Sequence, residues 1–96
     1  MDGGFRIKER VAFLFGSVVA MEIMEYYGLT KKEISEELAR NRHWLEMFAE
    51  TAMKFDFSLE EVHEAIDINV EYYSDHKQAL SKLAGTIINR RKSGWS

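Results

Sequence analysis

The chain has no cysteine and no proline among its 96 residues. Without cysteine there is no disulfide framework, no thiolate metal site and no cysteine nucleophile, so we expect a cytoplasmic protein. Without proline, no residue breaks a helix by removing a backbone donor. Many of the remaining positions are filled by Ala, Leu, Met, Glu, Lys and Arg, which are strong helix formers. The composition therefore predicts an all-α protein.

The sequence also lacks strand alternation, internal repeats and any linker between domains. A chain of this length is large enough for one hydrophobic core, so we expect a single helical domain over residues 1–96. A membrane span needs about 20 apolar residues, and Glu22 and Glu25 end the one long apolar segment too early. We therefore expect no membrane association.

The segment from Val11 to Met24 is apolar around its whole circumference, interrupted only by Gly16, Ser17 and Glu22. A helix without a polar stripe is normally buried on every side, and so short a chain has few elements to enclose it. We therefore expect a central first helix that self-associates, with Gly16 and Ser17 allowing close backbone approach. The candidate interface residues are Val11, Leu14, Phe15, Val18 and Met21.

Capping signals divide the chain into segments. Gly28 can take the left-handed conformation that closes a helix. Thr30 with Glu33 and Ser58 with Glu61 have the spacing of capping boxes. These signals predict a four-helix bundle with a long second helix. The expected helices lie near residues 5–27, 30–55, 58–73 and 75–92.

Charge is unevenly distributed between the last two expected helices. Residues 58–74 contain five carboxylates and no Lys or Arg, a charge of −5, whereas residues 75–96 contain five basic residues and one aspartate, a charge of +4. We expect these two helices to lie side by side and antiparallel. The alternative is that the basic end meets an acidic surface on another molecule.

Residues 29–45, LTKKEISEELARNRHWL, resemble the helix-turn-helix segment of small DNA-binding regulators. The resemblance implies that Asn41 caps a recognition helix and that a DNA-binding unit covers residues 29–48. It also implies contacts to DNA from Arg40, Arg42 and His43. The net charge of −3 is unfavourable for this function, although DNA binding depends on a local basic patch rather than on the sum.

The apolar residues of the same segment instead favour one continuous helix over residues 30–55. They keep a single angular phase on a 3.6-residue period, which a turn near Asn41 would not be expected to preserve. In that case Arg40, Arg42 and His43 point in different directions and form no recognition surface. The residues in phase are Ile34, Leu38, Leu45, Phe48, Ala49, Ala52 and Met53.

Two carboxylate patterns bear on catalysis. Glu60 and His63 form one half of a di-iron motif, and the chain has no second half. Glu33-x-x-Glu36 and Glu64-x-x-Asp67 distantly resemble the acidic pairs with which all-α nucleotide pyrophosphohydrolases hold Mg²⁺. Such spacings arise readily by chance on helices this rich in glutamate, so we expect no enzyme, no metal and no cofactor.

The histidine residues show no sign of a catalytic role in the sequence. We expect His43 and His76 to be exposed and to lack a catalytic partner.

Aromatic and methionine side chains exceed what four short helices can enclose, and such residues are enriched at protein interfaces. We therefore expect a non-enzymatic protein that acts by protein–protein binding, as a regulator, adaptor or inhibitor, and forms a homo-oligomer, most simply a dimer. A DNA-binding regulator is the alternative.

Overall fold

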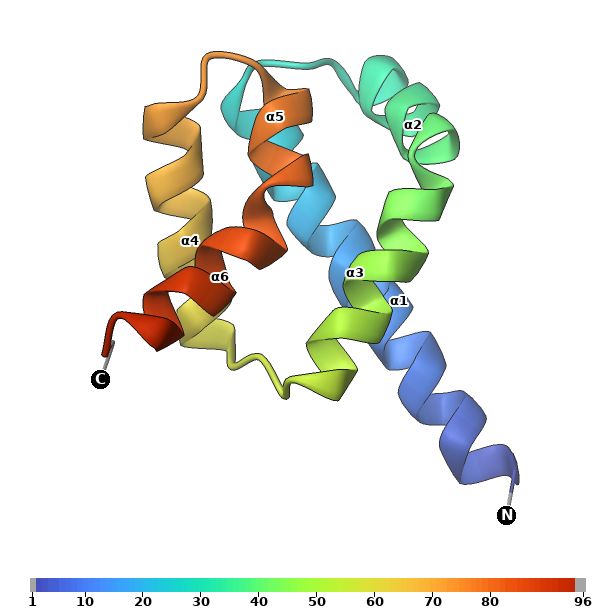
Figure 1. Ribbon diagram of the computed structural model, residues 1–96. Coiled ribbons are helices and arrows are strands. Elements are labelled where there is room, and N and C mark those ends of the chain that lie inside the picture. Colours follow the sequence, from blue (N-terminus) through green and yellow to red (C-terminus); the bar gives the residue numbers. More distant parts are fainter. Residues whose placement is uncertain (1, 95–96) are drawn as a thin grey trace.

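The computed structural model describes the backbone of residues 2–94 and the side chains of residue 11 and residues 13–94. Over this range the chain is all-helical, which confirms the predicted fold class, but the four-helix arrangement is not confirmed because two of the expected helices are interrupted. Figure 1 shows the arrangement. The helices are α1 (Asp2–Tyr26), α2 (Lys31–Arg40), α3 (Arg42–Lys54), α4 (Leu59–Tyr72), α5 (His76–Ser81) and α6 (Leu83–Lys92).

The hydrophobic core is shared by all six of these helices. α1 has its most extensive contact with α3, and α4 packs mainly against α6. Side chains with almost no exposed surface come from α1 (Ile23 and Met24), from α4 (Val62) and from α6 (Leu83 and Ile87). Residues far apart in the sequence therefore meet in one continuous core.

The prediction of one long second helix is wrong, because Asn41 separates α2 from α3. The backbone amide and the side-chain amide of Asn41 both donate to the carbonyl of Glu37, over 2.9 Å and 2.7 Å. An asparagine side chain that bonds to the local backbone competes with the helix in this way. Only one residue leaves the helix, so Ile34 and Leu45 stay buried on the same side of the chain. This is why the periodicity predicted a continuous helix.

The last expected helix is interrupted at Lys82, which separates α5 from α6. The fully buried Asn69 of α4 lies behind this break and donates to the carbonyl of Ala79 over 3.0 Å. A continuous helix would pair that carbonyl with the amide of Leu83. Thr86 of α6 donates to the side-chain oxygen of Asn69 over 2.8 Å. One buried amide thus holds both halves of the interrupted helix against α4.

The predicted capping boxes are confirmed. The Thr30 side chain accepts from the amide of Glu33 over 3.2 Å, and the Glu33 carboxylate accepts from the amide of Thr30 over 2.8 Å. Ser58 and Glu61 make the same reciprocal pair at the start of α4. Gly28 has φ +80° at the end of α1, as a helix-closing glycine requires.

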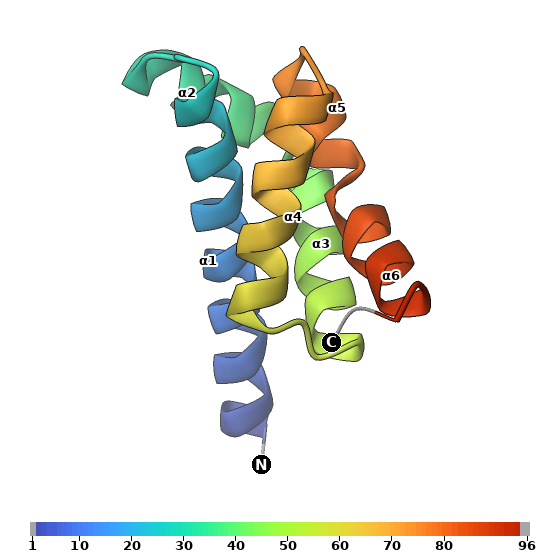
Figure 2. The same cartoon turned by 90° about the vertical axis from the view of Figure 1, so that its left-hand side faces the viewer.

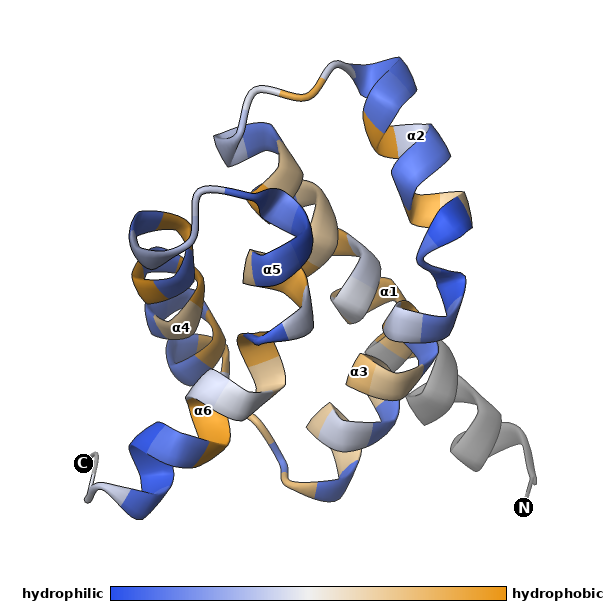
Figure 3. Ribbon diagram, turned by 45° about the horizontal axis from the view of Figure 1, so that its top comes forward, coloured by the Kyte–Doolittle hydropathy of each residue, from blue (hydrophilic) through white to orange (hydrophobic). Residues whose placement is uncertain are grey.

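The predicted antiparallel pairing of the acidic and basic segments is confirmed. Figure 2 shows α4 and α6 side by side and running in opposite directions. Arg91 pairs with Glu61 and Arg90 pairs with Glu64, the latter over 3.4 Å. Figure 3 shows how hydrophilic residues gather along α2 and at the C-terminal end of α6. The basic end of the chain thus has acidic neighbours within the same molecule.

Candidate interaction surface

Helix α1 is buried on one face and exposed on the other, so the expectation of burial on every side is wrong within the single chain. The buried face carries Val19, Ala20, Ile23 and Met24, none more than 3% exposed. On the opposite face four large apolar side chains remain in solvent. They are Val11 (59% exposed), Leu14 (62%), Val18 (57%) and Met21 (39%), which together we name the α1 stripe.

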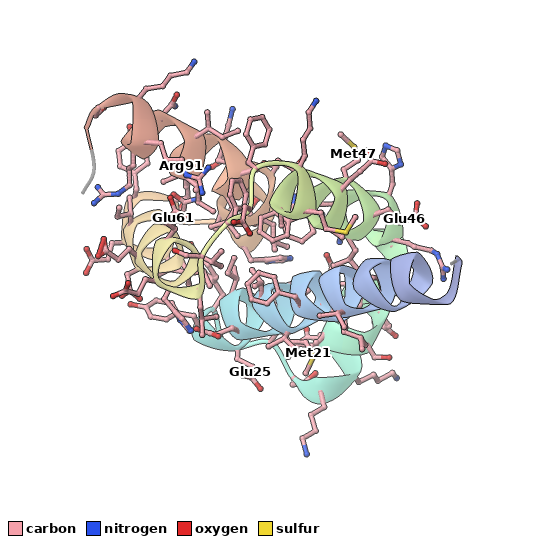
Figure 4. The ribbon with its side chains drawn as sticks, turned by 90° about the horizontal axis from the view of Figure 1, so that it is seen from below. Met21, Glu25, Glu46, Met47, Glu61 and Arg91 are labelled. Atoms are coloured by element: carbon pink, nitrogen blue, oxygen red, sulfur yellow. The ribbon has the colours of Figure 1, made fainter. Side chains whose placement is uncertain are left out.

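The α1 stripe has the spacing of a coiled-coil seam. Its residues are separated by three, four and three positions, the alternation that keeps side chains facing a second helix. Glu25 continues the spacing four residues beyond Met21, and Ile7 continues it four residues before Val11. In Figure 4, Met21 and Glu25 lie on the side of α1 that faces away from α3 and α6. A helix face with this spacing can pack against a second helix.

The structure separates the remaining predicted interface residues from the α1 stripe. Phe15 is half-buried and packs against the hydrophobic core. Gly16 faces α3, since a side-chain carbon there would lie 3.5 Å from the carbonyl oxygen of Leu45. Ser17 donates to the carbonyl of Phe13 over 3.1 Å. The close approach that Gly16 permits is therefore between α1 and α3, and the expectation that it serves a partner is not supported.

The surroundings of the α1 stripe are polar toward the C-terminal end of α1. Glu22 lies 3.4 Å from the imidazole Nδ1 of His63 on α4, and Glu25 is exposed. In Figure 2, α1 forms one edge of the molecule along most of its length, with α2 near its C-terminal end. An apolar strip with a charged border is the usual anatomy of a protein interface.

The predicted DNA-contacting residues are all exposed, and two of them have acidic partners. The Arg40 guanidinium lies 2.9 Å from the carboxylate of Glu37. Arg42 lies 3.5 Å from Glu46, one turn along α3, and its guanidinium also covers the ring of Phe13. Their positive charge is thus compensated within the chain.

The outward face of α3 does not have the character of a recognition helix. Glu46, Met47 and Glu50 are exposed on it, so it presents two carboxylates and an apolar side chain where DNA phosphates would approach. Glu46 and Met47 are marked in Figure 4. In addition, the break at Asn41 covers a single residue, whereas the motif has a turn of about 3–4 residues. The geometry gives the DNA-binding alternative no support, and it stays a prediction.

The residues singled out for metal binding are not brought together. His63 pairs with Glu22 rather than with Glu60, and Glu64 pairs with Arg90. Glu33 is engaged in the capping box at the start of α2. In the part of the chain that the structure describes, no three His, Asp or Glu side chains lie close enough together to hold a metal ion.

Sequence reasoning missed a buried polar cluster around Glu37, which is 8% exposed. Its carboxylate accepts from Arg40 and Asn41 and lies 3.3 Å from the Nε2 atom of His76 on α5. The hydrogen bond to His76, followed by those to Arg40 and Asn41, lowers the pKa of Glu37, although burial acts in the opposite direction. The expectation that His76 is exposed is wrong, since it fastens α5 to the end of α2.

Comparison with protein-family models, with curated proteins and with solved structures returned no significant match to the chain. Among the helices in the described part of the chain, none is long and apolar enough to cross a membrane. The α1 stripe is therefore defined by its own exposure and spacing.

Proposed function

We propose that this protein acts by binding proteins, as a regulator, adaptor or inhibitor rather than as an enzyme, and that it self-associates through the α1 stripe. The observation that carries the proposal is the exposure of Val11, Leu14, Val18 and Met21 in a row along α1. Soluble monomers rarely leave a large contiguous apolar patch in water, and such patches usually mark interaction sites.

The energetic gain from covering the α1 stripe is substantial for so small a protein. Moving a Val, Leu or Met side chain fully out of water contributes about 1.5–3 kcal/mol. Each of the two copies would contribute four such side chains. In the single chain these side chains are about half exposed. Part of the gain is lost to the entropy of association, so we expect a reversible dimer rather than a permanent one.

The other exposed apolar side chains do not form a comparable row. Met47 lies on α3, Leu59 at the start of α4, and Tyr72 at the end of α4. The predicted surplus of aromatic and methionine residues is therefore distributed over several helices. The α1 stripe differs because its members share one face of one helix, at the spacing that a partner helix needs.

The proposal is tested by measuring the mass of the full chain in solution, by light scattering and sedimentation, from about 1 to 200 µM. We expect the mass to rise with concentration toward twice the chain mass. The variant Val18→Glu should stay monomeric at every concentration, because the dimer would bury its carboxylate without a partner. It should keep the helical circular dichroism of the wild type, since Val18 is exposed in the single chain.

Met47→Glu is the matched control. It introduces the same charge at an apolar residue of similar exposure, 54% against 57% for Val18, but on a different helix. It should dimerise like the wild type. A wild-type chain that is monomeric over the whole concentration range, or a dimer that Met47→Glu disrupts and Val18→Glu does not, would refute self-association through the α1 stripe.

A further inference from the structure

We infer that the partner of the α1 stripe is the α1 stripe of a second copy, packed antiparallel about a two-fold axis between Leu14 and Val18. This inference rests on the proposed self-association and adds its orientation and register. A two-fold interface uses the same patch on both subunits, so the patch must be complementary to itself. The α1 stripe meets this condition in the antiparallel direction.

The register follows from the spacing of the exposed residues. In an antiparallel pair of helices, each residue at one type of seam position faces the other type in the partner helix. Placing the axis between Leu14 and Val18 sets Leu14 opposite Val18 of the second copy. It also sets Val11 opposite Met21. Every member of the α1 stripe then faces an apolar side chain.

The charges along α1 select the antiparallel direction. The residues before the α1 stripe include three basic ones, Arg6, Lys8 and Arg10, and two acidic ones, Asp2 and Glu9, whereas Glu22 and Glu25 lie at its other end. In the antiparallel register Lys8 of the second copy lies on the same side of the seam as Glu22 and within two residues of its level, so opposite charges meet at both ends. In a parallel pair the exposed Glu25 would face Glu25 of the other copy on the seam, and two like charges placed side by side repel each other.

The shape of the molecule allows this arrangement. In Figure 1 the N-terminal turns of α1 extend beyond the other helices. Helix α1 has 25 residues, and its N-terminal part lies away from the bundle that buries Ile23 and Met24. In the antiparallel dimer the extended part of each α1 lies along the C-terminal half of the other. The second copy thus covers the α1 stripe over its whole length.

Cysteine cross-linking tests the orientation, because the natural chain has no cysteine to interfere. Val11→Cys and Met21→Cys are prepared separately in the full chain and oxidised alone or mixed. The mixed sample should give roughly tenfold more disulfide-linked dimer than either variant alone, since a disulfide needs Cα atoms within about 7 Å. In the antiparallel register two copies of residue 11 are about 15 Å apart along the helix axis, the rise of ten residues.

The controls separate orientation from association. Val11→Cys mixed with Met47→Cys should give no more cross-linked dimer than Val11→Cys alone, because Met47 lies on α3. Efficient cross-linking of Val11→Cys with itself would show a parallel dimer and overturn the inference while leaving self-association intact. A chain that dimerises by mass but gives no mixed disulfide would place the interface elsewhere. A chain that is monomeric by mass would overturn both proposals.

Discussion

At the scale of single residues, Arg91 joins three parts of the fold through one guanidinium group. Its Nε and Nη2 atoms donate to the carboxylate of Glu61, and its Nη1 atom donates to the carbonyl of Phe55 over 2.7 Å. A further hydrogen bond reaches the carbonyl of Asp56, which has φ +51°. The guanidinium also covers the ring of Phe57. Arg91 therefore fixes the turn between α3 and α4 to α6.

The Arg91 hydrogen bonds hold the pKa of Glu61 at about 2, well below its ordinary value of 4.5. Because the folded state favours the ionised carboxylate, its stabilisation is complete above about pH 4.5 and is lost as the pH falls toward about 2. Glu61→Gln should reduce the free energy of unfolding at pH 7 by about 1–2 kcal/mol. It should also make the dependence on pH between about 4.5 and 2 shallower than in the wild type.

Urea unfolding at several pH values between 7 and 2 measures both effects. Glu60→Gln is the control, since it removes an exposed carboxylate from the same turn of α4. Its pH dependence should follow the wild type. The lowered pKa of Glu37 contributes a slope of the same sign in every variant, so the comparison between variants isolates Glu61. Equal slopes for wild type and Glu61→Gln would contradict the prediction.

At the scale of elements, the contact between α1 and α3 depends on a small residue at position 16. A side-chain carbon there would lie 3.5 Å from the Leu45 carbonyl oxygen and 3.6 Å from the Phe48 ring, which is ordinary contact distance. Gly16→Ala should therefore raise the free energy of unfolding by up to about 1 kcal/mol, because alanine is the better helix former. Gly16→Leu should lower it by about 1–3 kcal/mol, because the larger side chain must push α3 away from α1.

Thermal or urea unfolding of Gly16→Ala and Gly16→Leu measures both changes in the free energy of unfolding. Both substitutions lie on the face of α1 opposite the α1 stripe, so the dimer of Gly16→Ala should match the wild type. Loss of stability in Gly16→Ala would mean that α1 and α3 approach more closely than the structure shows. Unchanged stability in Gly16→Leu would mean that this contact is loose.

At the scale of the whole molecule, the exposed ion pairs contribute little to the stability of the single chain. The exposed ion pairs, such as Arg90 with Glu64 and Arg42 with Glu46, are each worth about 0–1 kcal/mol and are screened by salt. Raising the salt concentration from about 0.05 to 0.5 M should therefore lower the free energy of unfolding by less than about 1 kcal/mol. The measurement uses the Val18→Glu variant. This variant is expected to stay monomeric, so its unfolding does not include the dissociation of a dimer.

The same salt series on the wild type reports on the dimer. Since opposite charges meet at both ends of the proposed interface, the dissociation constant should rise with salt while the stability of Val18→Glu changes little. A large loss of stability in Val18→Glu would contradict the prediction and show that buried ion pairs dominate the fold.

The sequence by itself determined the helical class, the capping boxes and the pairing of α4 with the basic end of the chain. These features depend on neighbours within one or two turns, or on the charge of a whole segment, and both can be read from residue order. The sequence also identified α1 as a helix with too much apolar surface. It therefore predicted four of the residues of the exposed face, although it added Phe15, which packs against the core.

Only the tertiary structure decided where the helices break and which face of α1 is left in water. Lys82 interrupts its helix because the buried Asn69 of α4 donates to the carbonyl of Ala79, and no local pattern encodes that partner. At Asn41 the competing hydrogen bond is local, but the Glu37 carboxylate beside it is also held by His76 of α5. An all-round apolar helix gives no indication of which side will pack. In the tertiary structure α3 packs on the face of α1 that contains Gly16 and leaves the α1 stripe exposed. Which face of α1 is buried therefore depends on where the neighbouring helix packs and not on hydrophobicity alone.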